Sequence, residues 1–136
     1  MNPDWPVREK AASEGVCPSK KILYVDDDEH WRDVVATLLQ DVGYEVLTAQ
    51  DATEAMVRTE GGKLSLIILD LNLAGEDGLM LMTFFQRNQP DVPIILYTGM
   101  SHDDDTILAM LQQGAHQYVR KGPLADLRQA VQGAVR

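Results

Sequence analysis

Residues 22–28 read ILYVDDD, a continuous apolar run that stops abruptly in acidic side chains. Residues 64–70 read LSLIILD and repeat the pattern, with Asp70 directly after the apolar run. A short run that is apolar at nearly every position is typical of a strand buried on both faces of a parallel sheet. The two stretches therefore predict central strands that end in carboxylates.

Helical patterns alternate with the apolar runs along the rest of the chain. The apolar spacing predicts strands over residues 22–25, 44–49, 64–69, 93–97 and 117–119. It predicts helices over residues 51–60, 77–88 and 103–113, a first helix that ends at Gly43, and a last helix with an apolar face of Leu124, Leu127, Val131 and Val135. Five strands alternating with five helices indicate an α/β fold, in which a doubly wound parallel sheet is covered on both faces.

The first 20 residues differ from the rest of the chain. They contain three prolines and mixed charges without any periodicity, so we expect residues 1–20 to be a mobile N-terminal extension. Residues 21–136 are expected to form one domain.

Composition limits the possible partners and the location. The net charge of −9 argues against direct binding to nucleic acid. No apolar run approaches the roughly 20 residues of a membrane span, and the start lacks a signal-peptide pattern. The single cysteine, Cys17, fits a reducing compartment. We therefore expect a cytoplasmic protein whose partners are proteins or a small charged group.

Polar residues interrupt the apolar pattern where predicted strands end, at Asp26, Asp27, Asp70, Thr98 and Lys121. In open parallel sheets, ligands bind beyond the carboxyl ends of the strands. Three carboxylates gathered there repel one another, and a hard cation such as Mg²⁺, or alternatively Mn²⁺, relieves the repulsion. A carboxylate can also attack phosphorus, while a lysine and a hydroxyl stabilise the transferred group. The pattern predicts a metal-assisted phosphoryl site.

Four segments carry a family resemblance: ILYVDDD, LIILDLNLAGEDGL, PIILYTG and GAHQYVRKG. In order, spacing and residue type they resemble the response-regulator receiver domains of two-component signalling systems. The resemblance covers residues 21–136. It implies a flavodoxin-like sheet with strand order 2-1-3-4-5.

The resemblance also implies roles for individual residues. Asp70 matches the phosphoacceptor, which receives its phosphoryl group from a histidine kinase or a histidine phosphotransfer protein. Asp27 and Asp70 match residues that bind Mg²⁺ directly, and Asp26 matches a ligand that acts through water. Asn72 matches the residue whose backbone carbonyl binds the metal. Such a domain catalyses only its own phosphorylation and dephosphorylation and is not otherwise an enzyme. Because Gly122 follows the matching lysine where many relatives have proline, we expect a trans peptide bond there.

The implied output is a conformational switch. Thr98 and Lys121 match the residues that contact the phosphoryl group, and Tyr118 matches the aromatic residue that changes rotamer when the threonine moves. The surface expected to respond comprises the fourth helix, the fifth strand and the fifth helix, where a downstream protein or a second copy would bind. The alternative is a pseudo-receiver that binds partners without phosphorylation, although such domains have usually lost acidic-pocket residues and none is missing here. An aspartyl phosphatase of the haloacid dehalogenase type fits less well, since its nucleophile ends the first strand.

Overall fold

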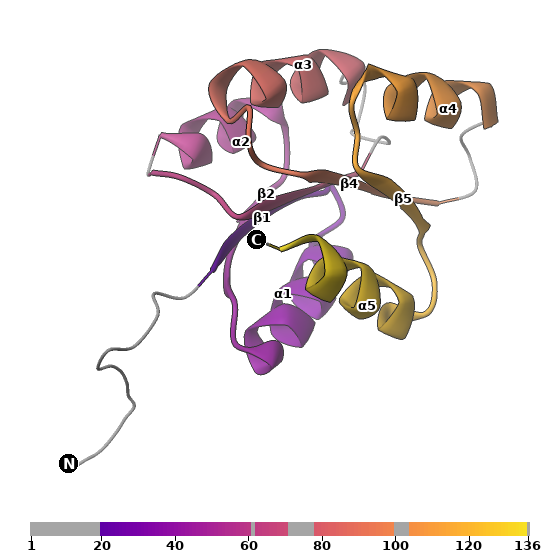
Figure 1. Cartoon of the computed structure of the whole chain (residues 1–136). Coiled ribbons are helices and arrows are strands. Elements are labelled where there is room, and N and C mark those ends of the chain that lie inside the picture. The colour runs from indigo at the N-terminus through magenta and orange to yellow at the C-terminus, as the bar shows by residue number, and fades with distance from the viewer. Residues whose placement is uncertain (1–19, 61, 71–77, 100–103, 136) are drawn as a thin grey trace, which may run out of the picture.

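The computed structural model describes residues 20–60, 62–70, 78–99 and 104–135, in which five strands alternate with five helices (Figure 1). The strands are β1 (Lys21–Val25), β2 (Glu45–Ala49), β3 (Leu66–Leu69), β4 (Ile94–Thr98) and β5 (Gln117–Arg120). The helices are α1 (Glu29–Val42), α2 (Ala52–Thr59), α3 (Gly78–Asn88), α4 (Asp104–Gln113) and α5 (Leu124–Ala134). Residues 1–19 lie outside the described residues, so the N-terminal extension remains a prediction.

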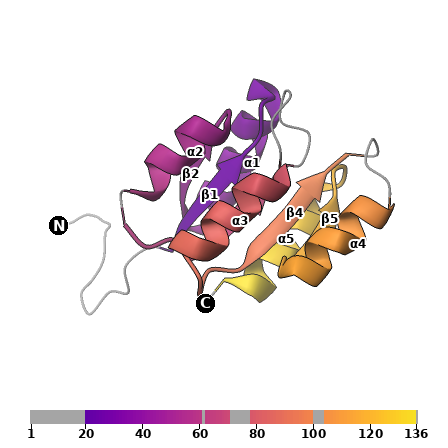
Figure 2. The same ribbon diagram turned by 90° about the horizontal axis from the view of Figure 1, so that it is seen from above.

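All the strands belong to one parallel sheet with the order β2-β1-β3-β4-β5. Helices α1 and α5 cover one face of the sheet, and α2, α3 and α4 cover the other (Figures 1 and 2). The predicted doubly wound architecture and strand order are therefore confirmed. Strand order reverses between β1 and β3, which places the crevice of the fold at the carboxyl ends of these two strands.

The sheet separates two hydrophobic cores, and the alternation of side chains along each strand explains the division. In β1, Leu23 and Val25 pack in the core under α2, α3 and α4. Ile22 and Tyr24 pack in the core under α1 and α5. Strand β3 is buried at every position, which is why its sequence is apolar throughout rather than alternating.

Local signals fix the first helix. Asp28 is its N-cap, and the Asp28 carboxylate accepts hydrogen bonds from the backbone N–H groups of His30 and Trp31. Gly43 ends the helix in the left-handed region with φ 113°, where a side chain would be strained. Both ends of the helix are therefore fixed by local residues, and its N-cap directly follows Asp26 and Asp27.

Element boundaries differ slightly from the sequence prediction. Strand β3 begins at Leu66 rather than Leu64, because the Leu64 N–H donates to the side chain of Gln89 instead of a neighbouring strand. The other boundaries shift by at most one residue. No peptide bond within the described residues is cis, in agreement with the expected trans bond before Gly122. None of the described helices is both long and apolar enough to span a membrane.

Candidate functional site

The backbone ladders bring the predicted acidic residues together at the carboxyl edge of the sheet. β1 and β3 are neighbours in register, and the Asp70 N–H donates to the carbonyl of Val25 at 2.9 Å. This bond extends the ladder by one residue and places Asp70 beside Asp26. On the other side, the Lys121 N–H donates to the Thr98 carbonyl at 2.9 Å. Parallel pairing thus gathers side chains that lie far apart in the sequence.

Asp26, Asp27 and Asp70 form a cluster in which one carboxylate oxygen from each lies within 4.8 Å of the others. Asp26 and Asp70 are buried, whereas Asp27 is exposed. Mg²⁺ takes oxygen ligands at about 2.1 Å, so opposite ligands stand about 4 Å apart. The cluster therefore fits a cation of this size after small side-chain movements, and the exposed side at Asp27 gives water ligands access. The predicted Asn72 carbonyl lies outside the described residues.

Lys121 links the two buried carboxylates. Its Nζ atom lies 2.7 Å from Asp26 Oδ2 and 2.9 Å from Asp70 Oδ2, and its side chain is only 13% exposed. Burial alone would lower the pKa of Lys121, but the hydrogen bonds and charges of both carboxylates outweigh burial and raise it. The lysine therefore carries its positive charge beside Oδ2 of both Asp26 and Asp70.

Asp26 accepts more bonds than the sequence interpretation foresaw. The Tyr24 hydroxyl donates to Oδ2 of Asp26, and the Asp28 N–H donates to Oδ1 at 3.0 Å. The Arg32 guanidinium donates to the Asp26 carbonyl at 2.8 Å. Burial and then the charge of Asp26 raise the pKa of Tyr24. Sequence reasoning missed Tyr24, although its spacing of two residues from Asp26 along a strand places both side chains on one face.

The ring of Trp31 lies beside Lys121 and packs against a second aromatic ring. The Trp31 ring centroid is 5.1 Å from the Lys121 Nζ atom, within range of a cation–π contact. Trp31 also packs edge-on against Tyr97, with ring centroids 5.8 Å apart and an interplanar angle of 83°. Any displacement of the lysine would therefore change the environment of Trp31.

Thr98 ends β4 with a buried hydroxyl. Its side chain is fully buried, and within the described part of the chain Oγ1 has no hydrogen-bond partner. A Cβ added at the next residue, Gly99, would meet no atom within 4 Å. A buried donor without a partner is costly in a folded protein. An oxygen-rich ligand at this edge would satisfy it.

Tyr118 lies on the same face of the sheet as Thr98. It is the register partner of Leu96, and both pack in the core under α2, α3 and α4. Thr98 follows Leu96 by two residues and so faces the same side. Tyr118 is partly buried.

Comparisons with known proteins agree with this geometry. Residues 22–132 match the model of the response regulator receiver domain. The nitrogen assimilation regulatory protein NtrX of Azorhizobium caulinodans is 36% identical over 77% of this chain and 23% of its own length. The transcriptional regulatory protein PrrA of Mycobacterium tuberculosis is 35% identical over 87% of this chain and 51% of its own length. The response regulator TrrA of Thermotoga maritima, solved in complex with Mg²⁺ and BeF, superposes with a TM-score of 0.75 and 32% identity, covering 85% of this chain and 99% of TrrA.

The fold, the edge cluster and the family match define a signalling module rather than a classical enzyme. The chain belongs to the response regulator receiver domain family. It spans 23% of the length of NtrX and 51% of the length of PrrA.

Proposed function

We propose that this chain is a phosphorylatable switch that accepts a phosphoryl group on Asp70 in a Mg²⁺-dependent reaction. The observation that carries the proposal is the arrangement around Asp70: the Lys121 ammonium group lies 2.9 Å away, and the carboxylates of Asp26 and Asp27 lie in ligand range. The buried Thr98 hydroxyl, which has no partner among the described residues, ends the neighbouring strand β4. The phosphoryl donor is a histidine kinase or a histidine phosphotransfer protein. The chain promotes only its own phosphorylation and dephosphorylation.

Each side chain has a chemical role in this reaction. An Asp70 oxygen attacks the phosphorus, a P–O bond forms, and the P–N bond to the donor histidine breaks as the imidazole leaves. Lys121 and the Thr98 hydroxyl hold the negative oxygens of the group in transfer. Asp27 and Asp70 would bind Mg²⁺ directly, Asp26 through water. When bound, Mg²⁺ supplies the positive charge that offsets the carboxylates and the phosphoryl oxygens.

The test is intact mass after incubation with Mg²⁺ and acetyl phosphate. The wild-type chain should gain one phosphoryl group, and excess EDTA should prevent the gain. Asp70→Asn should gain none, since an amide oxygen is a poor nucleophile. Equal labelling of Asp70→Asn, or full labelling in EDTA, would contradict the proposal. A folded wild type that never takes up the group would favour the pseudo-receiver alternative.

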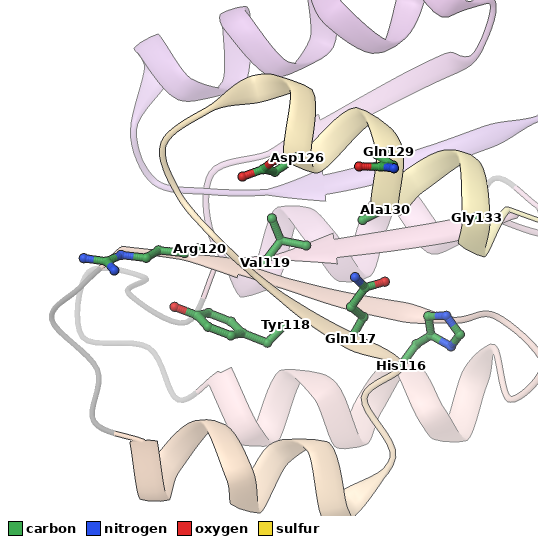
Figure 3. Close-up of a pocket in the computed structure, with 9 residues that line it drawn as sticks. All are labelled: His116, Gln117, Tyr118, Val119, Arg120, Asp126, Gln129, Ala130 and Gly133. Carbon is green, nitrogen blue, oxygen red and sulfur yellow. The ribbon is translucent and has the colours of Figure 1, made fainter.

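The output face in this proposal comprises α4, β5 and α5. A groove of about 470 Å³ runs along the open side of β5 beside α5, and its lining includes Tyr118, Arg120 and Asp126. Figure 3 shows Val119 pointing toward α5 and Tyr118 lying on the α4 side of the strand. When the Thr98 hydroxyl follows a phosphoryl oxygen, the space it vacates lets Tyr118 turn inward. The surface around β5 then changes for a downstream protein or a second copy.

The experiment for this output compares amide NMR shifts with and without beryllofluoride, which mimics the phosphoryl group. Wild type should shift at the pocket and at β5, and Thr98→Ala should shift at the pocket only. Distant shifts that persist in Thr98→Ala, or a response confined to the pocket in wild type, would refute this coupling route.

A further inference from the structure

We propose that Tyr24 is a positioning residue: it holds the Asp26 carboxylate so that Lys121 can leave it for the phosphoryl group. The inference rests on the proposed function, because it concerns the step in which Lys121 meets a phosphorylated Asp70. Tyr24 touches no reacting atom and would act only through Asp26.

The geometry places Tyr24 and Lys121 on one oxygen. Both the Tyr24 hydroxyl and the Lys121 Nζ atom contact Oδ2 of Asp26, while the Asp28 N–H holds Oδ1. Asp26 is fully buried, so loss of a donor is not repaired simply by exposure to bulk water. A buried carboxylate that loses a partner is strongly penalised.

Lys121 is shared between two carboxylates, and its contact with Asp26, at 2.7 Å, is shorter than its contact with Asp70, at 2.9 Å. Phosphorylation adds negative oxygens on the Asp70 side and draws the lysine toward them. Asp26 and the phosphoryl group therefore compete for one cation. Lys121 moves to the phosphoryl group more readily when Asp26 keeps another hydrogen-bond donor.

Tyr24 can be that donor because its ring does not depend on the lysine. It is fully buried in the core under α1 and α5, with its ring centroid 6.4 Å from that of Tyr97. The hydroxyl is therefore held in place by β1 and the core while the flexible lysine side chain moves. Without the Tyr24 hydroxyl, Asp26 would lose one of its side-chain donors and would hold Lys121 more strongly.

The chain offers a matched control on the same face of the sheet. Tyr97 is also fully buried, and its hydroxyl has no hydrogen-bond partner within the described residues. Burial raises the pKa of Tyr97, and the backbone of Gly122 partly offsets the rise. Tyr97→Phe thus removes a buried hydroxyl that does not bond Asp26, whereas Tyr24→Phe removes one that does.

The experiment measures Mg²⁺ affinity alone and then beryllofluoride affinity at saturating Mg²⁺. Trp31 fluorescence reports both, in a Trp5→Phe background that leaves Trp31 as the single tryptophan. Tyr24→Phe should weaken beryllofluoride binding about tenfold, the effect expected of one hydrogen bond to a charged group. Its Mg²⁺ affinity should stay within about twofold of wild type, because Mg²⁺ alone brings no oxygens that compete for Lys121. Tyr97→Phe should match wild type in both.

A second measurement uses the unaltered chain, so it does not depend on the folding of Tyr24→Phe. The hydroxyl proton of Tyr24 should give a slowly exchanging, downfield NMR signal that persists when beryllofluoride binds. Loss of that signal on binding would overturn the inference. So would unchanged beryllofluoride affinity in Tyr24→Phe, equal weakening of Mg²⁺ and beryllofluoride binding, or the same weakening in Tyr97→Phe. A wild type without any beryllofluoride response would refute the proposed function, and this inference with it.

Discussion

Replacing Lys121 with methionine tests how far a single cation stabilises the acidic cluster. Methionine keeps much of the length of the side chain and removes its charge. In the wild type, Lys121 Nζ contacts Asp26 and Asp70 at 2.7 and 2.9 Å, and their side chains are 0% and 3% exposed. Removing one partner of a buried ion pair costs about 3–5 kcal/mol. Because the lysine side chain is 13% exposed, we expect the lower end, about 3 kcal/mol, or about 12 °C in Tm.

The metal should reverse part of this loss. In Lys121→Met the carboxylates have no competing ammonium group, so saturating Mg²⁺ should stabilise the variant more than the wild type, by about 1 kcal/mol. The assay is urea unfolding at pH 7 followed by circular dichroism, in EDTA and in Mg²⁺. The matched control is Lys63→Met, at an exposed lysine, which should change stability by less than about 0.5 kcal/mol. A loss below about 1 kcal/mol in EDTA, or equal gains from Mg²⁺ in both proteins, would refute the reasoning.

The remaining predictions concern the cluster, the switch and the aromatic core. Asp27→Ala should keep or slightly raise stability in EDTA, because it removes a repelling charge at an exposed position. The same variant should lose its stabilisation by Mg²⁺, and a full Mg²⁺ response in thermal melts would contradict the role of Asp27 as a ligand. Thr98→Val removes a buried hydroxyl without a described partner and should raise stability by about 1 kcal/mol in urea unfolding, whereas a loss of that size would show that the hydroxyl is already bonded. Burial raises the folded-state pKa of Tyr24 and Tyr97 above their ordinary value of about 10. Their contribution to stability is therefore complete below pH 10 and is lost as the pH rises further. Tyr24→Phe and Tyr97→Phe should each reduce this alkaline loss of stability in urea unfolding, and an unchanged pH profile would contradict the expected titration of the two hydroxyls.

The fold could be predicted because its decisive signals are local. A run such as residues 66–69 is apolar throughout, and only a strand covered on both faces needs that pattern. Asp28 and Gly43 are residues whose chemistry marks the two ends of a helix. The predicted strand over residues 64–69 is two residues longer than β3, because the hydrogen bond from Leu64 to the distant Gln89 side chain has no signal in the local sequence.

The convergence of the site residues was predictable for a different reason. Parallel strands all end at the same edge, so polar residues after several strands must meet there whatever the exact register. Asp26 and Asp70 do meet there, and each carboxylate lies within hydrogen-bond distance of Lys121. The contacts of Tyr24 with Asp26 and of Trp31 with Lys121 were not foreseen. They depend on side-chain rotamers and on how α1 packs, which periodicity does not encode.

The two neighbouring acids, Asp26 and Asp27, show how one step along the backbone separates two roles. Asp26 continues the alternation of β1, so its side chain turns inward on the face of Tyr24 and accepts bonds from Tyr24, Asp28 and Lys121. Asp27 follows on the opposite side and is exposed. A carboxylate already occupied by three protein donors has little capacity left for a cation, while an exposed one can exchange water for metal at low cost. The same sequence run thus places a carboxylate with three protein donors next to an exposed one, and a movement of Lys121 would leave Asp26 with Tyr24 and Asp28 as its donors.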